Sequence, residues 1–211
     1  MEESMTSSKK RTMFQAAMAM AVVVPMTGCA METGEPVDSN GEALSSKTPP
    51  TVPAALAVPD GNKLAFYFDA LGVQIYACQQ VGAGYGWVFQ APRATLLNRG
   101  GQVAGTHYVG PTWEANDGSK VAGAKVGAFV ADTRAIPWLL LKAVSHEGDG
   151  RMAKVTFIQR LDTAGGLAPT DPAKICDAAH AGTVEHPGSI EEVDYAATYF
   201  FYEALDASSE E

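Results

Sequence analysis

The chain has 211 residues, of which 46% are apolar and 18% are charged, which is the composition of a globular protein and not of a disordered one. This length suits a single domain of ordinary size. The formal net charge is −9. Because an acidic surface repels phosphate backbones, we expect no nucleic acid partner.

The first 28 residues have the three parts of an export signal. A basic cluster, Lys9 to Arg11, precedes an apolar run over residues 13–24, and small residues lead from there to Cys29. The apolar run is shorter than the about 20 residues that a membrane-spanning helix needs. We therefore expect residues 1–28 to be a signal peptide and the mature protein to work outside the cytoplasm.

The end of this segment, Met26-Thr27-Gly28-Cys29, resembles the lipobox of bacterial lipoproteins, with Met in place of the usual Leu. The resemblance implies that Cys29 is lipidated and becomes the acylated N-terminus, anchoring the protein in a membrane. Ala30 stands where an Asp would favour the inner membrane. The expected location is therefore the cell envelope, at the periplasmic or surface face of a Gram-negative outer membrane. The alternative is plain secretion, with Cys29 unmodified.

The composition divides the rest of the chain into three parts. Residues 29–51 are polar and rich in Ser, Pro and Gly, and such a segment cannot bury enough apolar area to fold. We expect it to be a disordered tether. Residues 52–205 form the expected β-rich domain, and residues 206–211 form a tail.

Within the domain, short stretches of alternating hydrophobicity are separated by turn residues. In the second of them, Val73, Ile75 and Ala77 share one face. The pattern predicts an all-β fold: a single antiparallel β-sandwich or small β-barrel with long loops. A short helical turn is expected within residues 168–181. The predicted strands are residues 64–68, 73–78, 86–89, 103–109, 120–126, 136–144, 154–160 and 193–202. The predicted turns are residues 59–62, 98–101, 116–119 and 148–150.

Two cysteines, Cys78 and Cys176, remain after Cys29. Exported proteins meet an oxidising compartment, so this pair predicts one disulfide. The alternative is a metal-binding or redox thiol pair. Neither residue lies in a Cys-x-x-Cys motif or beside a dense His cluster, which favours the structural disulfide.

Several strings of the domain, taken together, resemble domain-of-unknown-function family 3455, whose members are secreted proteins of bacteria and fungi. The resemblance covers most of residues 52–203 and implies an exported β-rich domain with no established activity. The strings lie at residues 72–78, 91–94, 107–114, 117–119, 136–141, 158–166 and 195–202, together with Trp87 and Cys176.

The candidate ligand-binding residues lie close together in the chain: His107, Tyr108, Trp113, Glu114 and Asp117. A His near carboxylates can act as a base or a metal ligand, and a Trp beside polar groups often lines a small-ligand or sugar site. The competing interpretation is a structural hairpin with Trp113 in the core and Asp117 in a turn. We expect His107 at the edge of a loop.

Other polar residues give weaker signals. Arg160 and Asp162 are interpreted as an ordinary ion pair or turn. No ligand spacing matches a zinc or calcium site, and no strand is followed by a dinucleotide-binding glycine pattern. We therefore expect no metal and no cofactor, and the sequence identifies no catalytic residue.

Three functional hypotheses follow. The first is a non-enzymatic envelope or surface lipoprotein that binds a small molecule, a glycan or an envelope partner, with the membrane as a further partner through its lipid. The second is a hydrolase or metal-dependent enzyme that uses the region of His107, Glu114 and Asp117. The third is a purely structural envelope protein.

Overall fold

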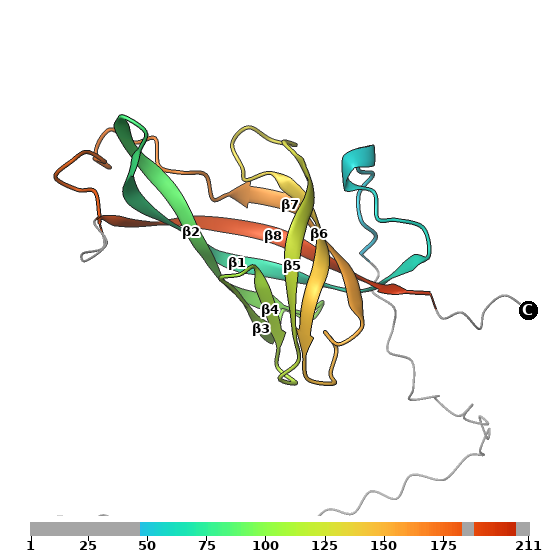
Figure 1. Cartoon of the computed structure of the whole chain (residues 1–211). Coiled ribbons are helices and arrows are strands. Elements are labelled where there is room, and N and C mark those ends of the chain that lie inside the picture. The colour runs from blue at the N-terminus through green and yellow to red at the C-terminus, as the bar shows by residue number, and fades with distance from the viewer. Residues whose placement is uncertain (1–46, 183–187, 206–211) are drawn as a thin grey trace, which may run out of the picture. The chain divides into compact units, whose positions relative to one another are not determined.

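Eight β-strands form a single antiparallel sheet in the computed structural model, which describes residues 47–182 and 188–205 (Figure 1). Each strand pairs with the next in the chain, and the last also pairs with the first, so the sheet closes into a barrel. The all-β antiparallel prediction is confirmed. The elements are the 3-10 turn η1 (Ala54–Leu56) and the strands β1 (Asn62–Val81), β2 (Gly84–Leu97), β3 (Val103–Tyr108), β4 (Thr112–Ala115), β5 (Lys120–Phe129), β6 (Trp138–Glu147), β7 (Val155–Gly165) and β8 (Ile190–Ala204).

Strand β1 joins two segments that the sequence predicts as separate strands, residues 64–68 and 73–78. Gly72, the last of the four residues between them, does not turn the chain. Its backbone lies so close to β2 that an added Cβ atom would be 2.1 Å from the carbonyl oxygen of Arg93. The glycine therefore permits a close approach of two strands, and β1 continues through it without a break.

Two further local details differ from the predictions. Strand β4 is not among the predicted strands, because four residues are too few to show a clear alternation. No helix forms within residues 168–181. There the carboxylates of Asp171 and Asp177 accept hydrogen bonds from the backbone N–H groups of Ala173 and Ala179, at 2.8 and 2.9 Å, and these bonds hold turns instead.

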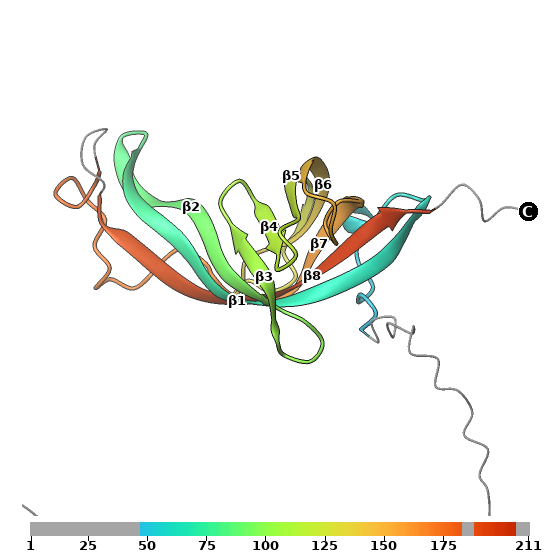
Figure 2. The ribbon, with the colours of Figure 1, turned by 90° about the horizontal axis from the view of Figure 1, so that it is seen from below.

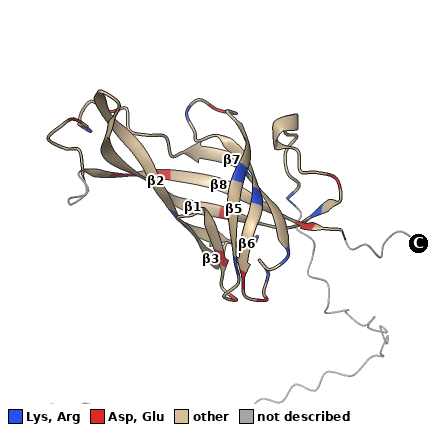
Figure 3. Ribbon diagram, viewed as in Figure 1, with Lys and Arg blue, Asp and Glu red and all other residues tan. Residues whose placement is uncertain are grey.

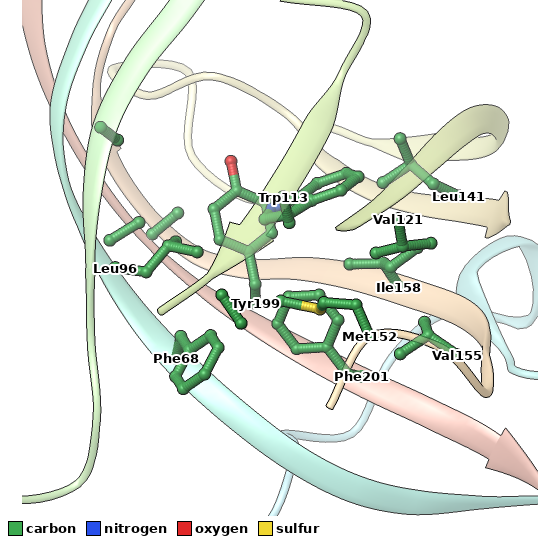
Figure 4. Close-up of a cluster of buried hydrophobic side chains, with 14 of the residues drawn as sticks. Phe68, Leu96, Trp113, Val121, Leu141, Met152, Val155, Ile158, Tyr199 and Phe201 are labelled. Atoms are coloured by element: carbon green, nitrogen blue, oxygen red, sulfur yellow. The ribbon is translucent and has the colours of Figure 1, made fainter. Parts of the chain in front are cut away.

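Side chains pack against both faces of the sheet at β8, which explains why aromatic residues follow one another in this strand. Tyr199 and Phe201 point into the barrel and belong to its main core, in which Figure 4 shows Trp113 beside Tyr199. Phe200 points outward and packs in a second cluster with Leu56 of η1. The N-terminal segment of the domain therefore covers the outside of the barrel at this place.

Strands β1, β2 and β8 continue past the point where β3 and β7 stop pairing with them. Figure 2 shows β1 and β8 running side by side as one long curved ribbon. The predicted disulfide lies on this extension and joins Cys78 of β1 to Cys176 in the loop that precedes β8. The amide of Cys78 also donates to the carbonyl oxygen of Ser189 at 2.9 Å. The β7–β8 loop is thus fastened to one end of the barrel.

The expected signal peptide, Cys29 and most of the expected tether lie outside the described residues. Among the residues that are described, no helix has the length and hydrophobicity of a membrane-spanning segment.

Candidate functional site

The hairpin formed by β3 and β4 places two of the candidate residues inside the barrel. His107 and Trp113 are direct cross-strand partners, so their side chains share a face. Their rings stack with centroids 4.5 Å apart and an interplanar angle of 9°. Both are buried, with 3% and 1% of their surface exposed. The expectation that His107 lies at the edge of a loop is therefore wrong.

Burial fixes the protonation state of His107. Its Nδ1 atom lies 2.8 Å from the carbonyl oxygen of Thr112, which can only accept, so Nδ1 carries the proton. Burial is the main cause that lowers the pKa of His107 from 6.5 to about 3, and the charge of Arg160 contributes in the same direction. At neutral pH His107 is uncharged, oriented by Thr112 and stacked on Trp113.

Tyr108 and Glu114 follow these residues along their strands and therefore lie on the opposite, outer face. The Tyr108 hydroxyl donates to Glu114 Oε2 at 2.9 Å, and Lys120 Nζ lies 3.7 Å from the same oxygen. Partial burial, and secondarily the contact with Glu114, raises the pKa of Tyr108. These contacts form a polar cluster on the outer surface of the barrel.

Asp117 lies in the turn between β4 and β5 and has a structural role there. Its carboxylate accepts hydrogen bonds from the amide and hydroxyl of Ser119, at 2.9 and 2.6 Å, and from the amide of Arg151 at 2.8 Å. The bond from Arg151 is the largest of the causes that lower the pKa of Asp117. Asp117 thus ties this turn to the connection between β6 and β7.

The five candidate residues are consequently divided among three places, and neither Glu114 nor Asp117 bonds to His107. In the part of the chain that the structure describes, no three His, Cys, Asp or Glu side chains group closely enough to hold a metal ion. The geometry does not bring together the base and carboxylates that the hydrolase hypothesis requires.

His107 and Trp113 do line a cavity of about 330 Å³ in the barrel, which reaches the surface on one side at the exposed residues Gln90 and Lys125. All eight strands contribute to its wall, so it exists only because the sheet closes. The wall is mainly apolar, with Gln74, His107, Arg160 and Tyr199 as polar groups in or beside the interior. The complete lining consists of Gln74, Phe89, Gln90, Pro92, His107, Gly110, Pro111, Trp113, Gly123, Ala124, Lys125, Leu139, Leu141, Arg160 and Tyr199.

Gly123 leaves room for the large ring beside the cavity. An added Cβ atom there would lie 3.2 Å from Cζ3 of Trp113 and 3.2 Å from Cβ of Leu141. Glycine at this position therefore lets the indole of Trp113 occupy the interior next to open space.

Sequence reasoning missed three of the polar groups in this wall. Gln74 is 2% exposed, and its side-chain Nε2 has no hydrogen-bond partner among the residues that the structure describes. It follows from the alternation of β1 that Val73 and Ile75 are less buried than Gln74 and Tyr76, so the polar side of this segment faces inward. A polar residue on the interior face of a strand could have been the signal, but the apolar residues beside it suggested the opposite orientation.

Arg160 is placed differently from the interpretation drawn from the sequence. It forms no ion pair with Asp162, and its Nε and Nη2 atoms donate to the carbonyl oxygen of Pro137 at 3.2 and 2.8 Å. Burial raises the pKa values of Tyr76, Tyr195 and Tyr199, and in each case the nearby charge of Arg160 partly opposes the rise. The guanidinium charge therefore acts on the barrel interior.

Fold and site together define a small antiparallel β-barrel with an internal cavity. The chain belongs to a family of proteins of unknown function, DUF3455, whose model matches residues 59–203. The resemblance found in the sequence is confirmed, and the matched span includes every residue that lines the cavity. No curated protein and no solved structure matches the chain.

Proposed function

We propose that this domain binds one small, largely apolar molecule inside the barrel. An eight-stranded barrel is about the size at which the interior can hold a single small ligand. The cavity of about 330 Å³ lies in the size range of known ligand sites, about 300–1,000 Å³. The observation that carries the proposal is a mainly apolar cavity that has polar groups of Gln74, His107, Arg160 and Tyr199 in or beside its wall.

Within the same hypothesis, a small molecule fits better than a glycan. Sugar sites use the open face of an aromatic ring together with many polar groups. Here one face of the Trp113 indole is covered by His107, and most of the wall is apolar.

The cavity can be tested with the neutral fluorescent probe N-phenyl-1-naphthylamine, which becomes bright in apolar surroundings. The Leu139→Trp substitution adds a ring to the cavity wall, and Val144→Trp adds the same ring at an exposed position of the same strand. We expect saturable binding to the wild type, at least about tenfold weaker binding to Leu139→Trp, a loss of about 1.4 kcal/mol, and no change for Val144→Trp. Thermal melting shows whether both variants fold. Absence of saturable binding, or equal losses in folded forms of both variants, would contradict the proposal.

We also propose that the protein is exported and lipid-anchored in the cell envelope through Cys29. Support comes from the basic, apolar and small-residue segments before Cys29 and from the two remaining cysteines, whose disulfide is the bond expected of a protein in an oxidising compartment. The hypothesis of a purely structural envelope protein predicts no ligand, so the probe experiment separates it from the ligand-binding proposal.

A further inference from the structure

We propose that the ligand of the barrel is an organic anion, with an apolar body in the cavity and a carboxylate-like group held by Arg160. This inference rests on the proposed function and adds the sign of the ligand's charge. Its starting point is the charge of the cavity wall.

The charges in the wall are all of one sign. Among the described residues that line the cavity, Arg160 and Lys125 are basic and none is acidic. The whole chain has the opposite balance, with 24 acidic and 15 basic residues. Figure 3 shows blue segments on the neighbouring strands β5 and β6, and of the basic residues on these two strands only Lys125 of β5 belongs to the cavity lining. The cavity thus combines an apolar wall with positive charge in an acidic protein.

Arg160 is partly buried and has no ion-pair partner among the described residues. Two of its five N–H groups donate to the carbonyl oxygen of Pro137, which fixes the direction of the side chain. Isolated charges in a low-dielectric interior are costly, and buried cations are normally paired. A guanidinium held in place and without a counter-charge is suited to receive a carboxylate or sulfonate.

Lys125 adds a weaker contribution at the edge of the same cavity. Its side chain is exposed, and it has no hydrogen-bond or ion-pair partner in the described chain. An exposed lysine attracts an anion over a distance of about 8–10 Å at ordinary salt. We therefore assign Lys125 to attraction of the ligand and Arg160 to direct contact with its anionic group.

The test uses two probes that differ by one anionic group. 8-Anilinonaphthalene-1-sulfonate has the rings of N-phenyl-1-naphthylamine and adds a sulfonate. We expect the wild type to bind the sulfonate probe more tightly than the neutral one. Arg160→Gln should weaken the sulfonate probe at least about tenfold, the size expected for one hydrogen bond to a charged group, and change the neutral probe less than twofold.

Two lysine variants complete the design. Lys125→Gln should weaken binding of the sulfonate probe about twofold at low salt and should have less effect on this binding at high salt. Lys154→Gln is the matched control, because Lys154 is exposed in the turn before β7, lies outside the cavity lining and is six residues from Arg160. It should leave both probes unchanged. If Arg160→Gln does not fold, Arg160→Lys is used instead. This substitution keeps the charge but removes the planar pair of N–H donors, and it should weaken binding of the sulfonate probe without changing binding of the neutral probe.

The outcomes distinguish this inference from the proposed function. If both probes bind equally and Arg160→Gln affects them alike, the anion proposal is wrong while the cavity remains a binding site. If neither probe binds the wild type, the proposed function fails and the anion proposal fails with it. Equal effects of Lys125→Gln and Lys154→Gln would remove Lys125 from the site.

Discussion

At the scale of single residues, the interior of the barrel is governed by partners and burial more than by residue type. His107 has the chemistry of a general base, but here it is uncharged, donates to the carbonyl oxygen of Thr112 and stacks on Trp113. Arg160 has the chemistry of an ion-pair member, but in the described chain it donates to the carbonyl oxygen of Pro137 and contacts the hydroxyl of Tyr199 instead of an acidic side chain. At both positions the role expected from the residue type is changed by the neighbouring residues in the folded structure.

The buried His107 makes stability depend on pH. The pKa of His107 is about 3 in the folded protein and 6.5 is its ordinary value, so between these values the unfolded chain binds a proton that the folded chain does not. The contribution of His107 is complete above pH 6.5 and is lost as the pH falls, by up to about 1.4 kcal/mol per pH unit. We expect His107→Gln to show a shallower loss of unfolding free energy than the wild type between pH 6.5 and 4. Denaturant titrations at a series of pH values measure this slope, and identical slopes would show that His107 is not buried in its neutral form.

At the scale of elements, the disulfide holds a long loop against a three-stranded extension. Cys78 lies on β1 where this strand pairs with β2 and its amide donates to Ser189, so it is fixed without the disulfide. Cys176 lies in a segment whose turns are held by side-chain bonds such as that of Asp177. The covalent bond therefore acts mainly on the loop between β7 and β8.

Removing this bond should cost stability without opening the barrel. The cysteines are 98 residues apart. For a loop of about 100 residues the chain-entropy model gives about 4.7 kcal/mol, and typical measured values are about 2–4 kcal/mol. We expect a Cys78→Ala, Cys176→Ala double variant to lose about 2–4 kcal/mol in denaturant unfolding and to keep its β-sheet circular dichroism. A reducing agent should lower the stability of the wild type by a similar amount and leave the double variant unchanged. A response of the double variant to the reductant would point to an effect outside this disulfide.

The strands and the site differ in how much of them the sequence can predict. Alternation finds strands wherever one face is apolar, and the segment 154–160 corresponds to most of β7. It misses β4, which is too short, and it divides β1 at residues 69–72, where the strand in fact continues through Gly72. Local pattern also places His107 and Trp113 together, because they belong to one hairpin.

The remaining site residues depend on closure of the sheet. Gln74 lies on β1, Arg160 on β7 and Tyr199 on β8, and pairing of β8 with both β1 and β7 brings them to one cavity. The local pattern of residues along one strand does not show which distant strands pair to close the sheet. Prediction of the interior from sequence would need the register of strands more than 80 residues apart.

At the scale of the whole molecule, the proposed binding of an apolar anion is compatible with the proposed location in the cell envelope. The proposed lipid on Cys29 would keep the domain at a membrane surface. A single acyl chain gives only marginal membrane binding, whereas the several chains of a bacterial lipoprotein anchor stably. The proposed location therefore depends on modification of one residue.

Substitution of that residue tests the location directly. Cys29→Ala removes the sulfur to which the diacylglycerol would be attached, and we expect the variant to leave the membrane fraction and to appear in the soluble part of the envelope or the medium. The disulfide should still form in it, because Cys78 and Cys176 do not depend on Cys29. Fractionation followed by immunoblotting gives the distribution, and mass spectrometry of the wild type shows whether its N-terminus is acylated. A Cys29→Ala protein that stays in the membrane fraction would mean that another part of the chain provides the anchor.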